Sequence, residues 1–160
     1  MTDCRRAALD TKIAFFDFSS IHPDAARAIS ARLKMANGMG WIDAPVSGGS
    51  VGAEEGTLAV MAGGDAADIE RVRPYVLAMA RRLTHMGPTG ADQSTKLCNQ
   101  VMVGCAMAVL AEATRLAVNA GIDAKRLPEA LAGGFAHCNC SCRAWRRAFI
   151  LRRLAISQRC

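Results

Sequence analysis

Two short segments of this chain carry residue types that together can bind a small acid and move a proton. The first is Ser47-Gly48-Gly49, which follows the run Asp43-Ala44-Pro45-Val46. Glycine lets backbone N–H groups approach an anionic oxygen closely, and the Ser47 hydroxyl adds one more donor. An ordinary strand-to-helix loop has the same composition, so this segment by itself does not identify a site.

The second segment contains Lys96, the only Lys or Arg between Arg82 and Arg115. It stands where a very apolar stretch begins, and a lysine near a helix start is not favoured by the helix dipole. Burial of an amine favours its neutral form, which suits acid–base chemistry. A solvated surface lysine is the plain alternative.

The elements that would position these groups alternate between strands and helices. Short β-branched and aromatic runs predict strands, and polar caps, Pro and Gly punctuate the helices between them. We predict strands over residues 12–18, 41–46, 57–61 and 82–86, with helices over 23–36 and 66–79. The alternation indicates an α/β fold in which helices cover a sheet.

Residues 91–119 have a different pattern, with no proline, one interior glycine (Gly104) and near-continuous Ala, Val, Leu and Met. We predict one long helix there, apolar on most faces, which must be buried against another domain or another subunit. Gly121 ends it, and Asp123 caps a further helix through about Ala132. We therefore expect a homo-oligomer or another association through the 91–119 helix.

Composition excludes several classes of protein. Apolar residues make up 51% and charged residues 21% of the chain, as in a folded globular protein. The longest apolar run, Val101 to Ala111, is broken by Gly104 and falls short of the 20 or so residues that cross a bilayer, so we expect no transmembrane segment. Because no apolar signal is visible near the N-terminus, we expect a cytoplasmic location.

The last 26 or so residues differ in composition from the rest. All 14 Asp and Glu lie before residue 135, so the net charge of +6 comes from the arginines of residues 135–160. Alternating Cys138, Cys140 and Cys142 lack the spacing of a zinc site, and we expect no metal. We favour a shifted reading frame over a nucleic-acid-binding segment as the origin of this Arg/Cys-rich tail.

The segments D-A-P-V-S-G-G (43–49), G-A-E-E-G-T-L-A-V-M-A-G-G-D (52–65) and H-M-G-P-T-G-A-D-Q-S-T-K-L-C-N-Q (85–100) resemble the β-hydroxyacid dehydrogenase family. That family includes 3-hydroxyisobutyrate dehydrogenase and 2-hydroxy-3-oxopropionate (tartronate semialdehyde) reductase, and it is related to 6-phosphogluconate dehydrogenase. The resemblance covers roughly residues 13–134. It implies an NAD(P)-dependent oxidoreductase with a small carboxylate substrate.

The resemblance also implies roles for individual residues. Lys96 would be the catalytic acid and base, Asn99 and Gln100 would contact the substrate, and Ser19 and Ser20 would approach the nicotinamide side of NAD or NADP. Ser47, Gly48 and Gly49 would bind the substrate carboxylate. The family usually has Asn where this chain has Gln100.

The chain also departs from the family, because no G-x-G-x-x-G turn occurs in it and only 42 residues precede Asp43. We therefore predict the C-terminal portion of a Rossmann-like NAD(P)-binding domain (1–89), followed by a long helix that starts an all-helical domain (90–134). The tail (135–160) would be separate. The main phosphate-binding turn would be absent, and independent activity would be impaired or lost.

Two other functions stay open at this point. The chain can be a non-catalytic dimerisation or interaction fragment that uses its long apolar helix. Alternatively, the arginine tail can bind nucleic acid or an anionic membrane surface.

Overall fold

The computed structural model describes residues 14–134, and these fall into two compact units, 14–98 and 99–134. The first contains β1 (Ala14–Asp17), α2 (Pro23–Asn37), β2 (Gly40–Asp43), β3 (Val46–Ser47), α3 (Gly49–Glu54), β4 (Leu58–Gly63), α4 (Ala66–Leu77), β5 (Ala80–Gly87) and the first turns of α5 (Ala91–Asn119). The second holds the rest of α5, the 3₁₀ turn η1 (Ala124–Arg126) and α6 (Leu127–Ala130). The predictions for residues 135–160, a frame-shifted Arg/Cys-rich tail without a metal site, lie outside the described residues.

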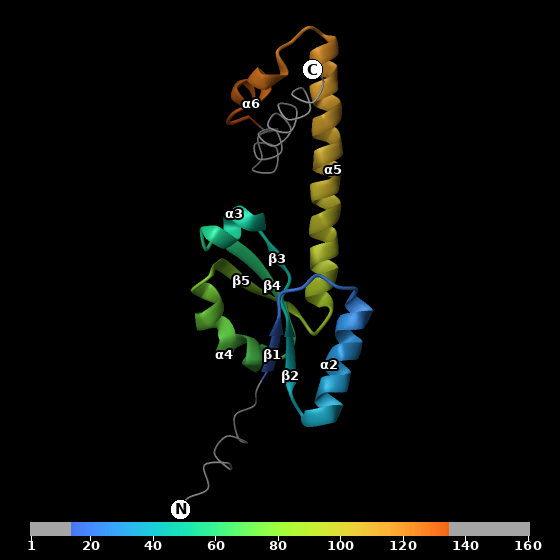
Figure 1. The fold of residues 1–160 in the computed structure, drawn as a ribbon, viewed down its shortest axis with the longest axis vertical. Helices are drawn as coiled ribbons and strands as arrows, with labels where there is room; N and C mark the ends of the chain where they lie inside the picture. The colour runs from blue at the N-terminus through green and yellow to red at the C-terminus, as the bar shows by residue number, and fades with distance from the viewer. Residues whose placement is uncertain (1–13, 135–160) are drawn as a thin grey trace, which may run out of the picture. The chain divides into compact units, whose positions relative to one another are not determined.

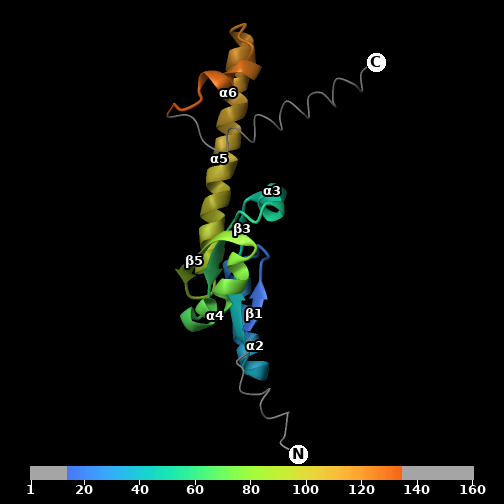
Figure 2. The ribbon, with the colours of Figure 1, turned by 90° about the vertical axis from the view of Figure 1, so that its left-hand side faces the viewer.

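The first unit is a mixed five-stranded sheet with helices on both faces (Figures 1 and 2). β1 pairs with β2 and β4 pairs with β5 in parallel, whereas β4 pairs antiparallel with both β2 and β3. The expected α/β architecture, a Rossmann-like portion followed by a long helix, is confirmed. The sheet brings the ends of β1 and β2 side by side, with Asp17 opposite Asp43.

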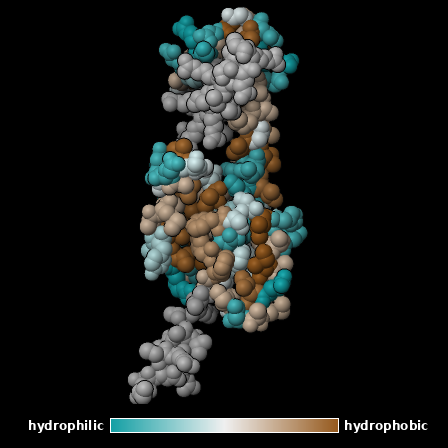
Figure 3. Space-filling model, in the orientation of Figure 1, coloured by the Kyte–Doolittle hydropathy of each residue, from teal (hydrophilic) through white to brown (hydrophobic). Residues whose placement is uncertain are grey.

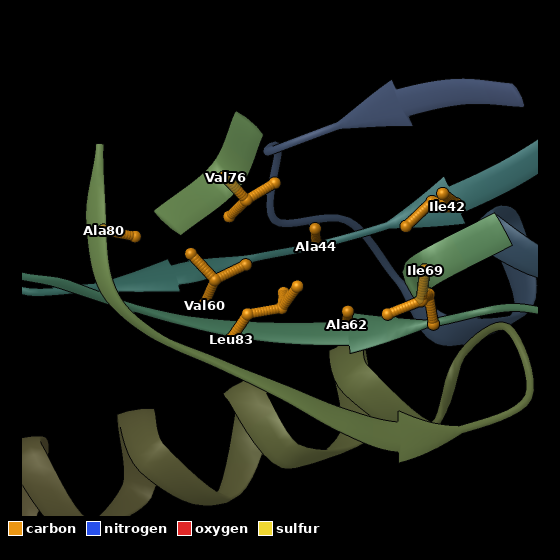
Figure 4. Close-up of a cluster of buried hydrophobic side chains, with 8 residues drawn as sticks. All are labelled: Ile42, Ala44, Val60, Ala62, Ile69, Val76, Ala80 and Leu83. Carbon is orange, nitrogen blue, oxygen red and sulfur yellow. The ribbon is translucent and has the colours of Figure 1, made fainter. Parts of the chain in front are cut away.

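The main core lies between α4 and the sheet (Figure 4). Ile69 and Val76 come from the apolar face of α4 and meet side chains of the strands. The buried strand and turn residues of this cluster are Ile42, Ala44, Val60, Ala62, Ala80 and Leu83. The Asp65 carboxylate accepts hydrogen bonds from the N–H groups of Ala67 and Asp68, so α4 begins where the sequence predicted.

The single strand predicted over residues 41–46 is wrong in one respect, because the chain forms two strands there. β2 ends at Asp43, and β3 begins at Val46 and pairs with Val60 of β4. Pro45 stands between them, and a proline has no N–H for a strand ladder. Its carbonyl still accepts a hydrogen bond from the N–H of Met61. The break places Ser47 at the end of β3, where it opens the turn Ser47-Gly48-Gly49, which we call the Ser47 loop.

Helix α5 has the bounds that the sequence predicted, Ala91 to Asn119. Its end is fixed by Gly121, whose φ of 73° lies in the left-handed region that favours glycine. Beyond it, the predicted helix through Ala132 is shorter and begins as the 3₁₀ turn η1. Pro128 explains this, since it cannot donate a backbone hydrogen bond to the preceding turn.

Most of the apolar surface of α5 is uncovered within residues 14–134, and Figure 3 shows apolar side chains along this helix. The exposed apolar residues of α5 are Leu97, Val101, Met102, Val103, Met107, Val109, Leu116 and Val118. By length and composition α5 is also a candidate membrane span, which the length of the run from Val101 to Ala111 did not predict. One such helix is weak support for a span, because core helices of soluble proteins pass the same test.

Candidate functional site

Lys96 and the Ser47 loop meet in the first compact unit. Lys96 lies in the second turn of α5, and its Nζ donates a hydrogen bond of 2.8 Å to the carbonyl oxygen of Val46. Val46 directly precedes Ser47 in β3, and the side chains of Lys96 and Ser47 are both half-buried. The structure thus brings together the amine and the loop that the sequence singled out separately.

The loop needs glycine at both positions after Ser47. Gly48 and Gly49 have φ values of 140° and 65°, which side-chain-bearing residues rarely adopt. A Cβ on Gly48 would also lie 3.0 Å from Cδ2 of Leu58. The carbonyl of Gly48 accepts the N–H of Gly52 in the first turn of α3. The conformation therefore depends on these two glycines.

The other predicted substrate residues lie in the second compact unit. Asn99 and Gln100 follow Lys96 on α5, and the Asn99 side-chain amide donates to the Gln100 side-chain oxygen at 3.3 Å. Their contact with a substrate stays a prediction.

Ser19 and Ser20 follow β1 and are exposed. The backbone N–H and the hydroxyl of Ser19 both donate to the Asp17 carboxylate. The cap of α2 is His22 rather than either serine, since Nδ1 of His22 accepts from the N–H of Asp24. Both serines therefore remain candidates for a cofactor contact.

A buried polar cluster beside this site was missed by sequence reasoning. Asp43, Asp92 and Gln93 are almost fully buried, and the Gln93 amide nitrogen donates to Oδ1 of Asp43 at 2.7 Å. Their positions in the sequence could have indicated burial, because Asp43 ends an apolar strand and Asp92-Gln93 opens an apolar helix. Polar residues at such inward positions require partners.

Burial raises the pKa of both carboxyls. The pKa of Asp43 is raised to about 7, first by burial and then by its hydrogen bond with Asp92, while the Gln93 amide acts in the opposite direction. The pKa of Asp92 is also raised by burial. The pair thus retains a proton well above the usual range of an aspartate.

The described residues do not provide the phosphate part of a dinucleotide site. A pyrophosphate needs N–H donors from a glycine-rich turn after a strand. The carboxyl ends of the parallel strands β1 and β2 instead carry Asp17 and Asp43. The Asp17 carboxylate accepts a hydrogen bond from the N–H of Ser19. Within residues 14–134, no group of three His, Cys, Asp or Glu is placed to hold a metal ion either.

Two family models match the chain. One is described as the NAD binding domain of 6-phosphogluconate dehydrogenase and matches residues 6–87. The other is described as NAD-binding of NADP-dependent 3-hydroxyisobutyrate dehydrogenase and matches residues 90–156. The second match crosses the change of composition near residue 134, and the origin of the tail stays a prediction.

Curated relatives agree with the family models. The chain is 40% identical over 133 residues to 2-hydroxy-3-oxopropionate reductase of Escherichia coli, covering 83% of this chain and 45% of that protein. It is 46% identical over 111 residues to NAD-dependent L-serine dehydrogenase of Pseudomonas aeruginosa, covering 69% and 37%. The chain therefore spans less than half the length of these two relatives.

A solved structure gives the same result. The Mycobacterium tuberculosis 3-hydroxyisobutyrate dehydrogenase with L-serine is 38% identical, with a TM-score of 0.69 over 79% of this chain and 43% of that one. The chain belongs to the β-hydroxyacid dehydrogenase family, whose members are NAD(P)-dependent oxidoreductases.

Proposed function

We propose that this chain is the substrate-binding and proton-transferring part of an NAD(P)-dependent hydroxyacid dehydrogenase. Its substrate is a small 3-hydroxy acid or the corresponding aldehyde acid. The observation that carries the proposal is the hydrogen bond from Lys96 to Val46, since it places an amine next to the Ser47 loop from 50 residues away. An amine beside an anion-binding turn is suited to a substrate with a carboxylate and a nearby hydroxyl.

In this proposal each predicted residue has one task. Ser47, Gly48 and Gly49 bind the carboxylate, and Lys96 gives a proton to the carbonyl oxygen during reduction or takes the hydroxyl proton during oxidation. Asn99 and Gln100 orient the substrate from the next turn of the helix. Ser19 and Ser20 contact the NAD or NADP that the family uses.

The names of the relatives support the substrate class. The substrates in those names, 2-hydroxy-3-oxopropionate, 3-hydroxyisobutyrate and L-serine, are short acids with a hydroxyl or aldehyde on the third carbon. A compact carboxylate site with one amine fits that shared pattern.

The test is turnover of these three acids by the full chain, with both cofactors. Lys96→Ala should lower kcat by at least about 100-fold, because a general acid–base group contributes on the order of 10² to 10⁴. Lys125→Ala, which removes an exposed lysine from η1, is the control and should leave the rate unchanged. Equal rates for the wild type and Lys96→Ala would refute the assigned role.

Absence of turnover in the wild type has a separate meaning, because it would refute independent catalysis by this chain. Calorimetric titration with 3-hydroxyisobutyrate then tests binding alone. Binding that is weakened by Ser47→Ala and Lys96→Ala, but not by Lys125→Ala, would support the substrate site. Undetectable binding by the wild type would refute it.

One observation favours the second candidate, association through α5. Only 6% of the most apolar 18-residue window of this helix is buried among the described residues. An uncovered apolar surface of this extent favours association over a monomer. We expect a homo-oligomer in the cytoplasm, and sedimentation equilibrium at several concentrations should give more than one chain mass. Replacing exposed Val101, Met102 and Val109 by Gln should return the monomer; a wild type that is monomeric throughout contradicts the expectation.

A further inference from the structure

The buried cluster of Asp43, Asp92 and Gln93 joins three parts of the first compact unit. Gln93 donates to Oδ1 of Asp43 at 2.7 Å and to the carbonyl of Ser19 at 3.0 Å. Its side-chain oxygen accepts the N–H of Ile21 at 3.2 Å. The start of α5 is thereby attached to the end of β2 and to the segment between β1 and α2.

The hydrogen bonds leave one oxygen of each carboxyl without a donor. Oδ1 of Asp92 accepts the N–H of Gly90 at 3.0 Å, and Oδ1 of Asp43 accepts from Gln93. The Oδ2 atoms of Asp43 and Asp92 are both buried and have no donor among the described residues. Two such buried oxygens are costly if both carboxyls are charged.

The charged groups near the pair are acidic or bound to other partners. Asp17 at the end of β1 is acidic and also raises the pKa of Asp43. Arg27 of α2 lies beside Gly90 but pairs with Asp24, and the His85 ring of β5 bonds to the carbonyls of Gly64 and Gly87. β4 contributes no charge here, because Asp92 fills the space where a side chain on Gly63 would lie. α5 contributes the neutral Gln93. Neither aspartate of the pair forms an ion pair with a described Lys, Arg or His.

We propose that Asp43 and Asp92 form a proton-binding site, in which one proton shared between their Oδ2 atoms holds the first turn of α5 to the end of β2. Asp43 lies directly opposite Gly63 in the pairing of β2 with β4, and the Asp92 side chain fills the space beside Gly63, so the two carboxyls are neighbours. A shared proton gives both orphaned oxygens a partner and removes one of the two buried charges. It also secures the helix turn that precedes Lys96.

The site predicts a specific dependence of stability on pH. An aspartate in the unfolded chain loses its proton near pH 4, whereas the folded pair keeps it until about pH 7. Between these values the folded state binds one proton more than the unfolded state, so stability falls as pH rises. It is greatest below about pH 4 for this pair and levels off above about pH 7.

The experiment is urea unfolding of the full chain at intervals from pH 5 to pH 8. The folding equilibrium constant of the wild type should fall by nearly tenfold per pH unit up to about pH 6.5, the signature of one proton. In Asp92→Asn the amide can donate to Asp43 and its oxygen can still accept from Gly90. That variant, and Asp43→Asn, should lose most of this slope. Glu54→Gln, on the exposed surface of α3, should retain it.

The other titratable groups are common to the wild type and Asp92→Asn, so the readout is the difference in slope between these two proteins. Equal slopes in these two proteins would overturn the proposal. Carbon-13 NMR of the aspartate carboxyls in the wild type gives a second readout that does not depend on how the variants fold. One carboxyl should titrate above pH 6, and titration of every aspartate below pH 5 would also overturn the proposal.

Discussion

Adding a single methyl group at Gly63 is expected to lower the free energy of unfolding by about 3 kcal/mol. A Cβ at this position would lie 1.9 Å from Oδ1 and 2.6 Å from Cγ of Asp92. Asp92 is fully buried, so its carboxyl cannot turn into solvent without losing the hydrogen bond from Gly90. The first turn of α5 must therefore shift away from β4 in Gly63→Ala.

Two further variants isolate this effect in urea unfolding followed by circular dichroism. Asp92→Gly removes the atoms that clash, so adding Gly63→Ala in that background should cost less than about 1 kcal/mol. Gly104→Ala, at an α5 position with nothing within 4 Å of a new Cβ, should stabilise the helix slightly. The same cost for Gly63→Ala in both backgrounds would show that contact with Asp92 is not the cause.

The second large effect is expected for Ile42→Ala in the main core. Ile42 is 0% exposed and packs in the cluster between α4 and the sheet, so its truncation leaves a cavity. We expect a loss of about 4 kcal/mol in the free energy of unfolding, since truncations of buried Ile to Ala cost about 2–5 kcal/mol.

The control for this prediction is Val101→Ala, since Val101 is 65% exposed on α5. It should change the free energy of unfolding by less than about 0.5 kcal/mol, apart from any effect on association. Thermal melts of the two variants at equal, low protein concentration provide the comparison. Similar losses for both variants would mean that the core does not lie where the structure places it.

Local signals in the sequence were sufficient for most of the helices. Asn37-Gly38 ends α2, Asp65 begins α4, and both bounds of α5 follow from the pattern between Gly90 and Gly121. The order of the strands depends on pairings between distant segments, and no local pattern specifies them. Pro45 was a visible signal for a break in the strand. The division into β2 and β3 also depends on how each of them pairs with β4, which is distant in the sequence.

The residues of the candidate site also divide into those that local sequence signals revealed and those that depend on distant contacts. Lys96 and Ser47-Gly48-Gly49 were found because each has a recognisable residue type and spacing, reinforced by the family resemblance. Asp43, Asp92 and Gln93 were missed because their importance arises only from contacts across about 50 residues and from burial. A single sequence does not show which polar residues point inward at an element's end.

The contacts of Gln93 have a consequence for how the polypeptide can be divided. They reach back 72 and 74 residues to Ile21 and Ser19, and 50 residues to Asp43. A protein cut before Gly90 would lose the Gln93 hydrogen bonds to the Asp43 carboxyl, the Ile21 N–H and the Ser19 carbonyl, although every strand of the sheet would be retained. A fragment that contains the sheet and keeps these contacts must therefore extend into α5, beyond the domain boundary predicted between residues 89 and 90.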